Sequence, residues 1–186
     1  KLIAQMGIEI GIVIGGGNVA IDCARTATRF GAAKVSMVCL EDRATMPASK
    51  QEIAEALEEN VKICNSWGPK EILKDENGHV TGVVFKKCIR TIDPETNKFS
   101  PLYDEEETAT VKADHVIFAI GQSIEWGSLL EGTKVEFWRG NYPVADSLTY
   151  QTAEPDIFVG GDVYHGPKFA IDAIEDGKCA AESLHR

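Results

Sequence analysis

Three consecutive glycines lie between an apolar run and an alanine-containing run near the start of the chain, in GIVIGGGNVAIDCAR (residues 11–25). Residues 10–14 are apolar and β-branched, which predicts a buried strand, and residues 18–30 carry apolar side chains at helical spacing. Between them, Gly15 to Ala20 fits the pattern G-x-G-x-x-G/A. A strand, a glycine loop and a helix in this order form the dinucleotide-binding fingerprint. The cluster therefore predicts a Rossmann-like parallel sheet.

Each position of this motif has a physical task in the predicted site. Gly15 permits the tight turn, Gly17 has no Cβ to keep a pyrophosphate off the backbone, and Ala20 lets the helix pack on the strand. The free amides and the positive end of the helix dipole then bind the phosphates. We therefore expect the cofactor to contact six consecutive residues: Gly15, Gly16, Gly17, Asn18, Val19 and Ala20. A glycine-rich turn that holds no ligand is the alternative.

An acidic residue follows the next predicted strand, at the distance that the fingerprint expects. Residues 34–40 predict a second buried strand, and Glu41 comes directly after it, 21 positions beyond Ala20. A carboxylate at this place can bond the ribose hydroxyls of NAD and repels the 2′-phosphate of NADP. Arg43 could instead bind that phosphate. The sequence favours NAD(H) and leaves NADP(H) open.

The middle of the chain predicts more parallel sheet, interrupted by antiparallel strands. Residues 49–52, Ser-Lys-Gln-Glu, form a capping box ahead of a predicted helix and a third strand. Asn77-Gly78 predicts a hairpin, and the turns and strands that follow up to residue 112 predict an inserted antiparallel β-meander. The apolar run at residues 115–120 predicts a return to the buried parallel sheet.

The last third of the chain is predicted to contain one strand and one helix. Residues 155–163, PDIFVGGDV, predict a strand that ends in glycines and an aspartate, and residues 168–185 predict a closing helix. Gly177 weakens this helix by roughly 1 kcal/mol relative to alanine. Close packing against a neighbouring element would explain the glycine.

Composition excludes several classes of partner and site. The net charge is −10 without a Lys/Arg-rich run, which argues against nucleic acid, and no apolar run approaches the ~20 residues of a membrane span. The five cysteines are widely spaced and contain no C-x-x-C pair. Neither a disulfide framework, a zinc site nor a thioredoxin-type redox pair is expected. We expect a reduced, cytoplasmic setting.

Four stretches, GGGNVAIDCART, MPAS, VIFAIGQ and PDIFVGGDVYHGPKFAIDAIEDGKCAAES, together resemble the flavoprotein family of the glutamate synthase small subunit. That family includes the flavin part of dihydropyrimidine dehydrogenase and has two dinucleotide-binding domains, like glutathione reductase. The resemblance implies an α/β fold in two parts. Residues 1–122 would form the NAD(P)H-binding domain, and residues 123–186 would form the C-terminal portion of an FAD-binding domain.

The resemblance also implies roles for residues outside the glycine motif. Asp22 would lie beside the nicotinamide, and Gly121-Gln122 would close over the cofactor. Gly161-Asp162 would end a strand under the flavin, with the Asp162 carboxylate bonding the ribityl chain. The flavin pyrimidine edge would face the first amides of the last helix, those of Lys168, Phe169 and Ala170. The predicted set contains no catalytic side chain and no metal ligand.

The activity implied by the resemblance is hydride transfer from NAD(P)H to FAD, followed by electron transfer to iron–sulfur clusters or to a larger catalytic partner subunit. The chain holds only one G-x-G-x-x-A, and the N-terminal FAD half and the iron–sulfur cysteine clusters of the family are missing. We therefore expect a fragment of a flavoprotein oxidoreductase that is inactive by itself. The alternative is a dinucleotide-binding module with no turnover of its own. The final electron acceptor stays open.

Overall fold

The chain is described by a computed structural model of residues 10–138 and 141–185. It divides into two compact units, residues 1–121 (unit 1) and residues 122–186 (unit 2), and each is described by itself. Among the described residues, none of the helices combines the length and the apolar composition that a membrane crossing requires.

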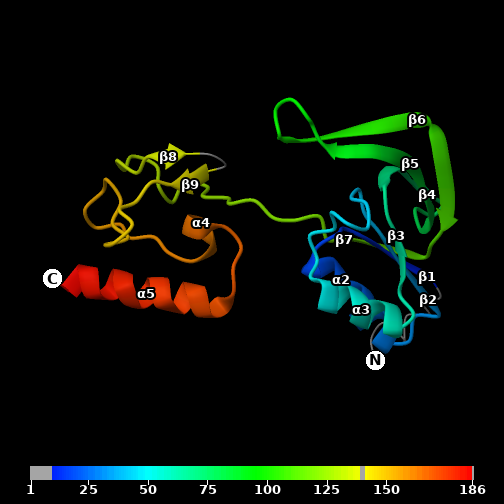
Figure 1. Cartoon of the computed structure of the whole chain (residues 1–186), viewed down its shortest axis with the longest axis horizontal. Coiled ribbons are helices and arrows are strands. Elements are labelled where there is room, and N and C mark those ends of the chain that lie inside the picture. Colours follow the sequence, from blue (N-terminus) through cyan, green and yellow to red (C-terminus); the bar gives the residue numbers. More distant parts are fainter. Residues whose placement is uncertain (1–9, 139–140, 186) are drawn as a thin grey trace. The chain divides into compact units, whose positions relative to one another are not determined.

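Unit 1 is built on a four-stranded parallel sheet (Figure 1). The strand order is β3-β2-β1-β7, from β1 (Ile10–Ile14), β2 (Lys34–Val38), β3 (Lys62–Cys64) and β7 (His115–Phe118). The central strand β1 is wholly apolar, and β2 has apolar residues at three of its five positions, as expected for strands of a sheet covered on both faces. The predicted Rossmann-like parallel sheet is confirmed. The expectation that residues 115–120 are buried is wrong, because β7 is an edge strand and leaves the Phe118 side chain 50% exposed.

Two helices cover one face of this sheet, α2 (Asn18–Arg29) and α3 (Lys50–Glu58) (Figure 1). The small side chains of Ala20 and Ala24 are fully buried, which lets α2 approach the strands closely. They belong to a core cluster that also contains Met37 from β2 and Ile53 from α3. The alanines of α2 therefore allow the helix to pack tightly on the sheet.

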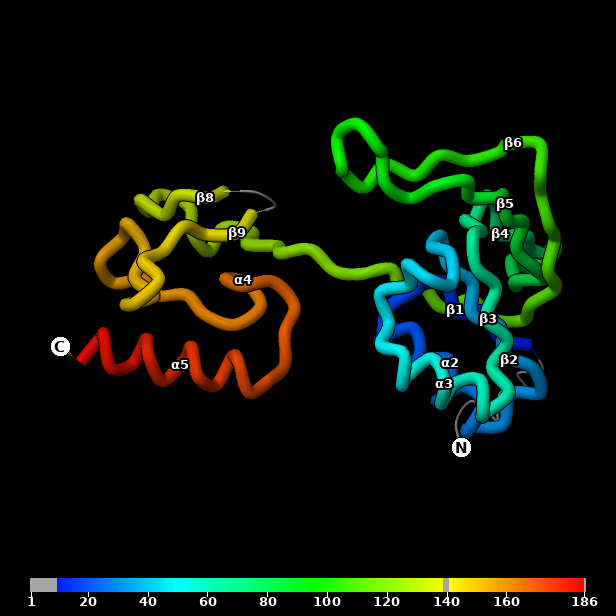
Figure 2. Tube along the Cα trace, in the orientation of Figure 1, coloured from blue at the N-terminus to red at the C-terminus, as the bar shows by residue number. Residues whose placement is uncertain are grey.

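An antiparallel meander covers the other face. It consists of β4 (Trp67–Lys74), β5 (Val80–Ile92) and β6 (Phe99–Lys112). The predicted turn at Asn77-Gly78 is present, with Gly78 at a φ of +86°. Past Trp67, the first residue of β4, the strands β5 and β6 continue as a two-stranded hairpin in which residues 88–92 pair with residues 99–103 (Figure 2). In this β5–β6 hairpin, cross-strand pairing continues up to the turn at residues 93–98.

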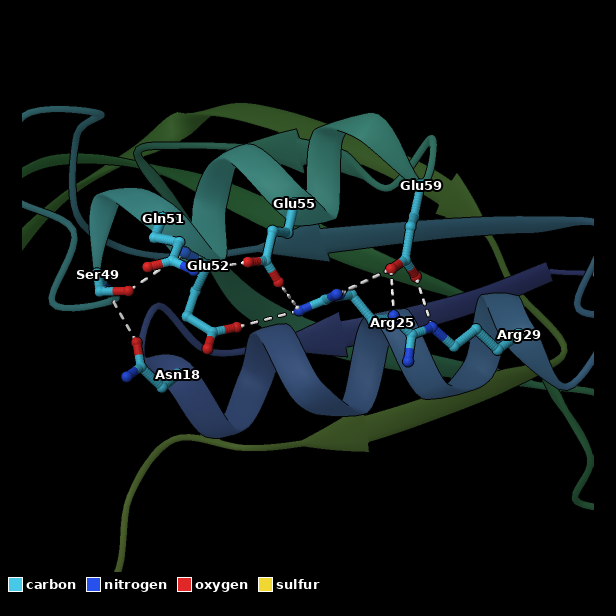
Figure 3. Close-up of polar contacts among 8 residues, drawn as sticks. All are labelled: Asn18, Arg25, Arg29, Ser49, Gln51, Glu52, Glu55 and Glu59. Carbon is cyan, nitrogen blue, oxygen red and sulfur yellow. Dashed lines mark hydrogen bonds and ion pairs between the residues drawn. The ribbon is translucent and has the colours of Figure 1, made fainter. Parts of the chain in front are cut away.

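A cluster of ion pairs joins the outer surfaces of α2 and α3 (Figure 3). The Arg25 guanidinium contacts the carboxylates of Glu52 at 3.3 Å, Glu55 at 2.6 Å and Glu59 at 2.9 Å. Arg29 also pairs with Glu59. These hydrogen bonds lower the pKa of the Glu59 carboxyl from 4.5 to about 2. The cluster fixes the two helices against each other on the side away from the sheet.

The predicted capping box at the start of α3 is only half correct. The Ser49 hydroxyl accepts a hydrogen bond from the Glu52 amide at 3.2 Å, as expected for an N-cap. The Glu52 carboxylate does not return to the Ser49 amide, because Arg25 holds it. The Ser49 amide instead donates to the side-chain oxygen of Asn18 at 2.8 Å.

Unit 2 contains little regular structure before its last helix. Its elements are β8 (Phe137–Trp138), β9 (Tyr142–Pro143), the short α4 (Asp162–His165) and α5 (Ala170–His185). The prediction of a strand over 155–163 is wrong: only an isolated bridge between Gln151 and Phe158 forms there. Residues 150–152 are its neighbour, but the pairing ends after this bridge and the bonds from the Val159 amide to the Tyr150 carbonyl and from the Thr152 amide to the Ile157 carbonyl, which is too short to make a strand.

The last helix also differs from its prediction. It begins at Ala170 and not at Lys168, because the Phe169 amide donates to the Asp172 carboxylate at 3.1 Å, a capping contact that sets the first turn. The expected close packing at Gly177 is absent, since a Cβ built there meets no described atom within 4 Å.

Candidate functional site

The glycine loop leaves β1 and enters α2 at the carboxyl edge of the parallel sheet. Gly15 has a φ of +150°, and a Cβ at this position would collide with the Ala119 carbonyl of the neighbouring β7 segment. A Cβ on Gly16 would come within 2.6 Å of the Glu41 carboxylate. Protein packing therefore explains the first two glycines.

Gly17 is different. Its φ of −93° and ψ of 178° are extended backbone, and a Cβ built on it meets no described atom within 4 Å. Neither backbone strain nor packing within the protein requires a glycine here. The open space beside this residue is the room that a ligand needs to approach the main chain.

The N-terminus of α2 is open to an anion. Gly17 is its N-cap and supplies no side-chain hydrogen bond, and the first turn contains no acidic residue. The first amides of the helix and the positive end of its dipole are thus not neutralised by their own helix. Such an end binds phosphate groups readily.

Residues 48–49, which precede α3, hold the glycine loop in place. The Ala48 amide donates to the Gly16 carbonyl at 3.0 Å, and the Ser49 amide donates to Asn18 at 2.8 Å (Figure 3). On the other side, the Gly15 amide donates to the Val38 carbonyl at the end of β2 at 2.9 Å. The loop conformation is therefore fixed from two sides before any ligand binds.

A pocket with a volume of about 320 Å³ lies beside this loop. We call it the glycine-loop pocket. Glu41, half-buried with its carboxylate against Gly16, is at one side, and Ile120 is at the other. The meander supplies a largely aromatic wall to the pocket, made by Trp67, Pro69, Phe99 and Tyr103. The pocket thus combines a backbone loop, one carboxylate and an apolar wall.

The predicted cofactor contacts of unit 1 are not all in this pocket. Gly15, Gly16 and Glu41 line it. Asn18, Val19, Asp22 and Arg43 are exposed and do not line it. The Asn18 side chain has a structural partner in Ser49, so its task includes anchoring the loop. Gly121, exposed at a φ of +116°, is the last residue of unit 1, and Gln122 is the first of unit 2.

The predicted flavin contacts lie in unit 2. Gly161 has a φ of +67° and is the N-cap of α4, whose first residue, Asp162, is exposed. The Asp162 carboxylate accepts a long hydrogen bond of 3.3 Å from the Lys168 amide. With the Phe169 amide bonded to Asp172, two of the three amides assigned to the flavin have acceptors within the chain, and Ala170 is the third.

A buried carboxylate organises the turn that carries Gly161. Asp176 of α5 is 5% exposed and accepts hydrogen bonds from the Gly161 amide at 2.7 Å and the Tyr150 hydroxyl at 3.0 Å. His165 lies 3.3 Å from the same carboxylate. The pKa of Asp176 is held below its usual value: burial opposes the shift, but the Gly161 and Tyr150 hydrogen bonds outweigh it. A Cβ on Gly160 would come within 2.8 Å of the Asp176 side chain, so this packing requires the glycine.

Residues 4–177 match the family profile described as pyridine nucleotide-disulphide oxidoreductase. The chain belongs to this family. The match extends over both units.

Two curated relatives support the resemblance seen in the sequence. The chain is 35% identical over 177 residues to the putative oxidoreductase AegA of Escherichia coli K12, covering 93% of this chain and 27% of AegA. It is 33% identical to the glutamate synthase [NADPH] small chain of Azospirillum brasilense over 175 residues, which is 94% of this chain and 36% of that protein. The resemblance to the glutamate synthase small subunit is confirmed, and the chain spans only about a third of these relatives.

A solved structure supports the fold. The crystal structure of T. acidophilum thioredoxin reductase superposes with a TM-score of 0.75 at 25% identity, over 96% of this chain and 52% of that one. The predicted α/β class is therefore confirmed.

The family description refers to disulphide chemistry, and no two of the five cysteines of this chain form a C-x-x-C pair. All five cysteines are free. Cys39 lines the glycine-loop pocket, but burial, aided by the nearby Glu41 carboxylate, raises the pKa of its thiol to about 12. A thiol with such a pKa stays protonated near neutral pH and is a poor nucleophile.

Sequence reasoning missed the residues that the rest of unit 1 contributes to the site. Phe99, Tyr103 and Trp67 come from the meander, and no pattern in their neighbourhood reveals that the hairpin folds toward the glycine loop. The contribution of Ala48 and Ser49 could have been predicted, because both belong to the stretch MPAS, which carries part of the family resemblance.

Proposed function

We propose that unit 1 binds NAD(P)H, with the pyrophosphate on the glycine loop and the first turn of α2. The observation that carries this proposal is Gly17, a glycine in ordinary extended backbone with open space where its Cβ would be. The backbone conformation at Gly17 does not require a glycine, whereas the close approach of a diphosphate does. The uncapped end of α2 supplies amides and positive potential at the same place.

The adenosine half of the cofactor fits the glycine-loop pocket. The Glu41 carboxylate, next to Gly16, is in position to accept hydrogen bonds from the two ribose hydroxyls. Phe99, exposed at the pocket edge, offers a flat apolar face for the adenine ring. Asp22, Gly121 and Gln122 remain proposed contacts of the nicotinamide half.

NADH is the proposed donor in preference to NADPH. A 2′-phosphate beside the half-buried Glu41 carboxylate would meet like charge at short range. Arg43 is exposed and outside the pocket lining, so it does not offset this repulsion from its present position. Four relatives carry NADPH in their names, which makes the donor the point to measure first.

In the larger protein, we propose that hydride passes from the nicotinamide to FAD, and that electrons leave through iron–sulfur clusters or a partner subunit. The flavin supplies the two-electron to one-electron conversion when bound. The part of this chain is to bind and orient: Asp162, Gly161 and the start of α5 (Lys168, Phe169, Ala170) are the proposed flavin contacts. Unit 2 is accordingly the proposed C-terminal portion of an FAD-binding domain.

Titration calorimetry of the chain with NADH, NADPH and ADP-ribose tests the proposal. We expect NADH and ADP-ribose to bind, and Gly17→Ala to weaken both by at least about tenfold, equivalent to roughly 1.4 kcal/mol. The matched control is Gly177→Ala, another glycine with open space around its Cβ, which should leave the affinity unchanged. The proposal fails if the chain binds neither ligand, or if the two alanine variants behave alike.

A dinucleotide-binding module without turnover is the second candidate function. It is favoured by the share of the relatives that the chain covers, 27% and 36%. The purified chain distinguishes the two: bound flavin gives a visible absorbance band, which would favour the redox function, whereas a colourless chain that binds NADH would favour the module.

A further inference from the structure

A second cavity in unit 1 lies between the parallel sheet and the meander, with a volume of about 220 Å³. We call it the β2–β3 cavity. Its lining residues come from five strands: Lys34, Ser36, Val38, Lys62, Cys64, Trp67, Phe85, Ala109 and Val111. It shares Trp67 with the glycine-loop pocket, but none of the glycine-loop residues and none of its other lining residues belong to that pocket.

Strand register sorts the lining into a polar end and an apolar end. Lys34, Ser36 and Val38 alternate along β2 and therefore share one face. In the parallel register of β2 and β3, Ser36 lies opposite Lys62 and Val38 lies opposite Cys64. The two lysines and the serine are thus grouped toward the amino ends of the strands, while the meander contributes apolar side chains.

The polar end lacks partners among the residues that the structure describes. Ser36 is 4% exposed, and its hydroxyl takes part in none of their side-chain hydrogen bonds. Lys34 and Lys62 are in no ion pair with a described carboxylate, although the chain carries a net charge of −10. By contrast, two lysines of the meander, Lys70 and Lys86, both pair with the Glu105 carboxylate. Among the described residues, Arg90 Nε is the one fully buried side-chain polar atom without a partner, so the Ser36 hydroxyl is accessible from the cavity and free to donate to a ligand atom.

We propose that the β2–β3 cavity binds a small monocarboxylate with an apolar tail, such as an arylalkanoate. The carboxylate would lie between Lys34 and Lys62 and accept a hydrogen bond from the Ser36 hydroxyl. The tail would pack against Phe85 and Trp67. The volume is below the ~300 Å³ at which drug-sized sites begin, which limits the ligand to a small molecule.

Trp67 provides the readout, because it is the one tryptophan of unit 1. In a Trp126→Phe/Trp138→Phe background, 3-phenylpropionate should change Trp67 fluorescence saturably. Neutral 3-phenylpropionamide and tail-free acetate should each bind more weakly, because one lacks the charge and the other the apolar body.

Charge-removing variants then locate the ligand. Lys34→Gln/Lys62→Gln should weaken 3-phenylpropionate by roughly fivefold, since each exposed ion pair is worth up to about 1 kcal/mol. It should leave the amide unaffected. The matched control, Lys74→Gln/Lys98→Gln, removes two exposed lysines of the meander that do not line the cavity and should change nothing.

Two further variants test the interior. Ser36→Ala should weaken the carboxylate but not the amide, and Ala109→Leu should abolish binding by filling the cavity, with circular dichroism as the check on folding. The proposal is overturned if fluorescence does not saturate, if acid and amide bind equally, or if the two lysine pairs have equal effects. Trp67 lines both pockets, so a fluorescence change that NADH abolishes and that the Lys34→Gln/Lys62→Gln variant leaves unchanged would place 3-phenylpropionate in the glycine-loop pocket and overturn the proposal.

Discussion

The side-chain oxygen of Asn18 accepts a hydrogen bond from the Ser49 amide, 2.8 Å away and 31 positions along the chain. This bond joins the glycine loop to the start of α3. Together with the bond from the Ala48 amide to the Gly16 carbonyl, it makes the segment before α3 a brace for the proposed phosphate site. A residue of the glycine motif thus acts on the loop itself, besides any contact with a ligand.

Asn18→Ala is expected to weaken NADH binding several-fold with only a small loss of stability. An exposed hydrogen bond of this kind contributes about 0.5–1.5 kcal/mol, and its loss leaves the loop free to move before binding. Calorimetry and thermal unfolding check the two effects. Thr26→Ala, an exposed position of α2 without this contact, is the control. If NADH affinity is unchanged in Asn18→Ala, the brace has no bearing on the site.

Glu41→Gln is expected to change cofactor preference. Removing the charge weakens the bonds to the ribose hydroxyls, about tenfold for a charged acceptor, and removes the repulsion of a 2′-phosphate. The ratio of NADPH to NADH affinity should therefore rise. Glu76→Gln, an exposed acid near the β4–β5 turn, should leave the ratio as it is. An unchanged ratio in Glu41→Gln would remove the basis for preferring NADH.

Phe99→Ala is expected to weaken ADP-ribose by about fivefold, because stacking of a ring on a base is worth about 1 kcal/mol. Nicotinamide mononucleotide, which has no adenine, should be unaffected, and Phe99→Tyr should retain affinity. Leu102→Ala is the control: it lies on the same β5–β6 hairpin, 46% exposed, and outside the pocket lining. Equal effects of the two alanine variants would contradict an adenine contact.

The ion-pair cluster predicts an acid-sensitive step in the unfolding of unit 1. The folded-state pKa of Glu59 is about 2 against 4.5 without its partners, so its stabilising effect is complete above pH 4.5 and is lost as the pH falls toward 2. Glu59→Gln should therefore flatten the fall of the urea midpoint over this range. The midpoint is followed by Trp67 fluorescence in the Trp126→Phe/Trp138→Phe background. Glu58→Gln, next to it but exposed and unpaired in the described structure, should keep the wild-type slope.

Local patterns were sufficient for most of unit 1. The apolar runs predicted the parallel strands, Asn77-Gly78 predicted the hairpin, and the three glycines predicted the loop and the start of α2. These features depend on period, turn chemistry and backbone freedom, all of which are local. The Ser49 cap was also predictable, but the partner of Glu52 was not, because Arg25 reaches it from another helix.

Contacts between segments far apart in the chain could not be predicted from local sequence patterns. PDIFVGGDV has the composition of a buried strand, yet this segment forms only one bridge, since a strand is defined by its neighbour. The aromatic wall of the glycine-loop pocket has the same origin: Phe99 and Tyr103 lie on a hairpin whose existence was predictable and whose direction was not.

The buried Asp176 has a consequence for how unit 2 responds to acid. The turn at Gly161 depends on one ionised group, the Asp176 carboxylate. Because the pKa of this carboxyl lies below its usual value, the hydrogen bonds to it weaken only when acid protonates it. The bonds from the Gly161 amide and the Tyr150 hydroxyl to its two oxygens would then weaken in the same event, because the charge that strengthens both is lost. Acid would therefore loosen the Gly161 turn and its contact with Tyr150 in one step, and not by gradual fraying.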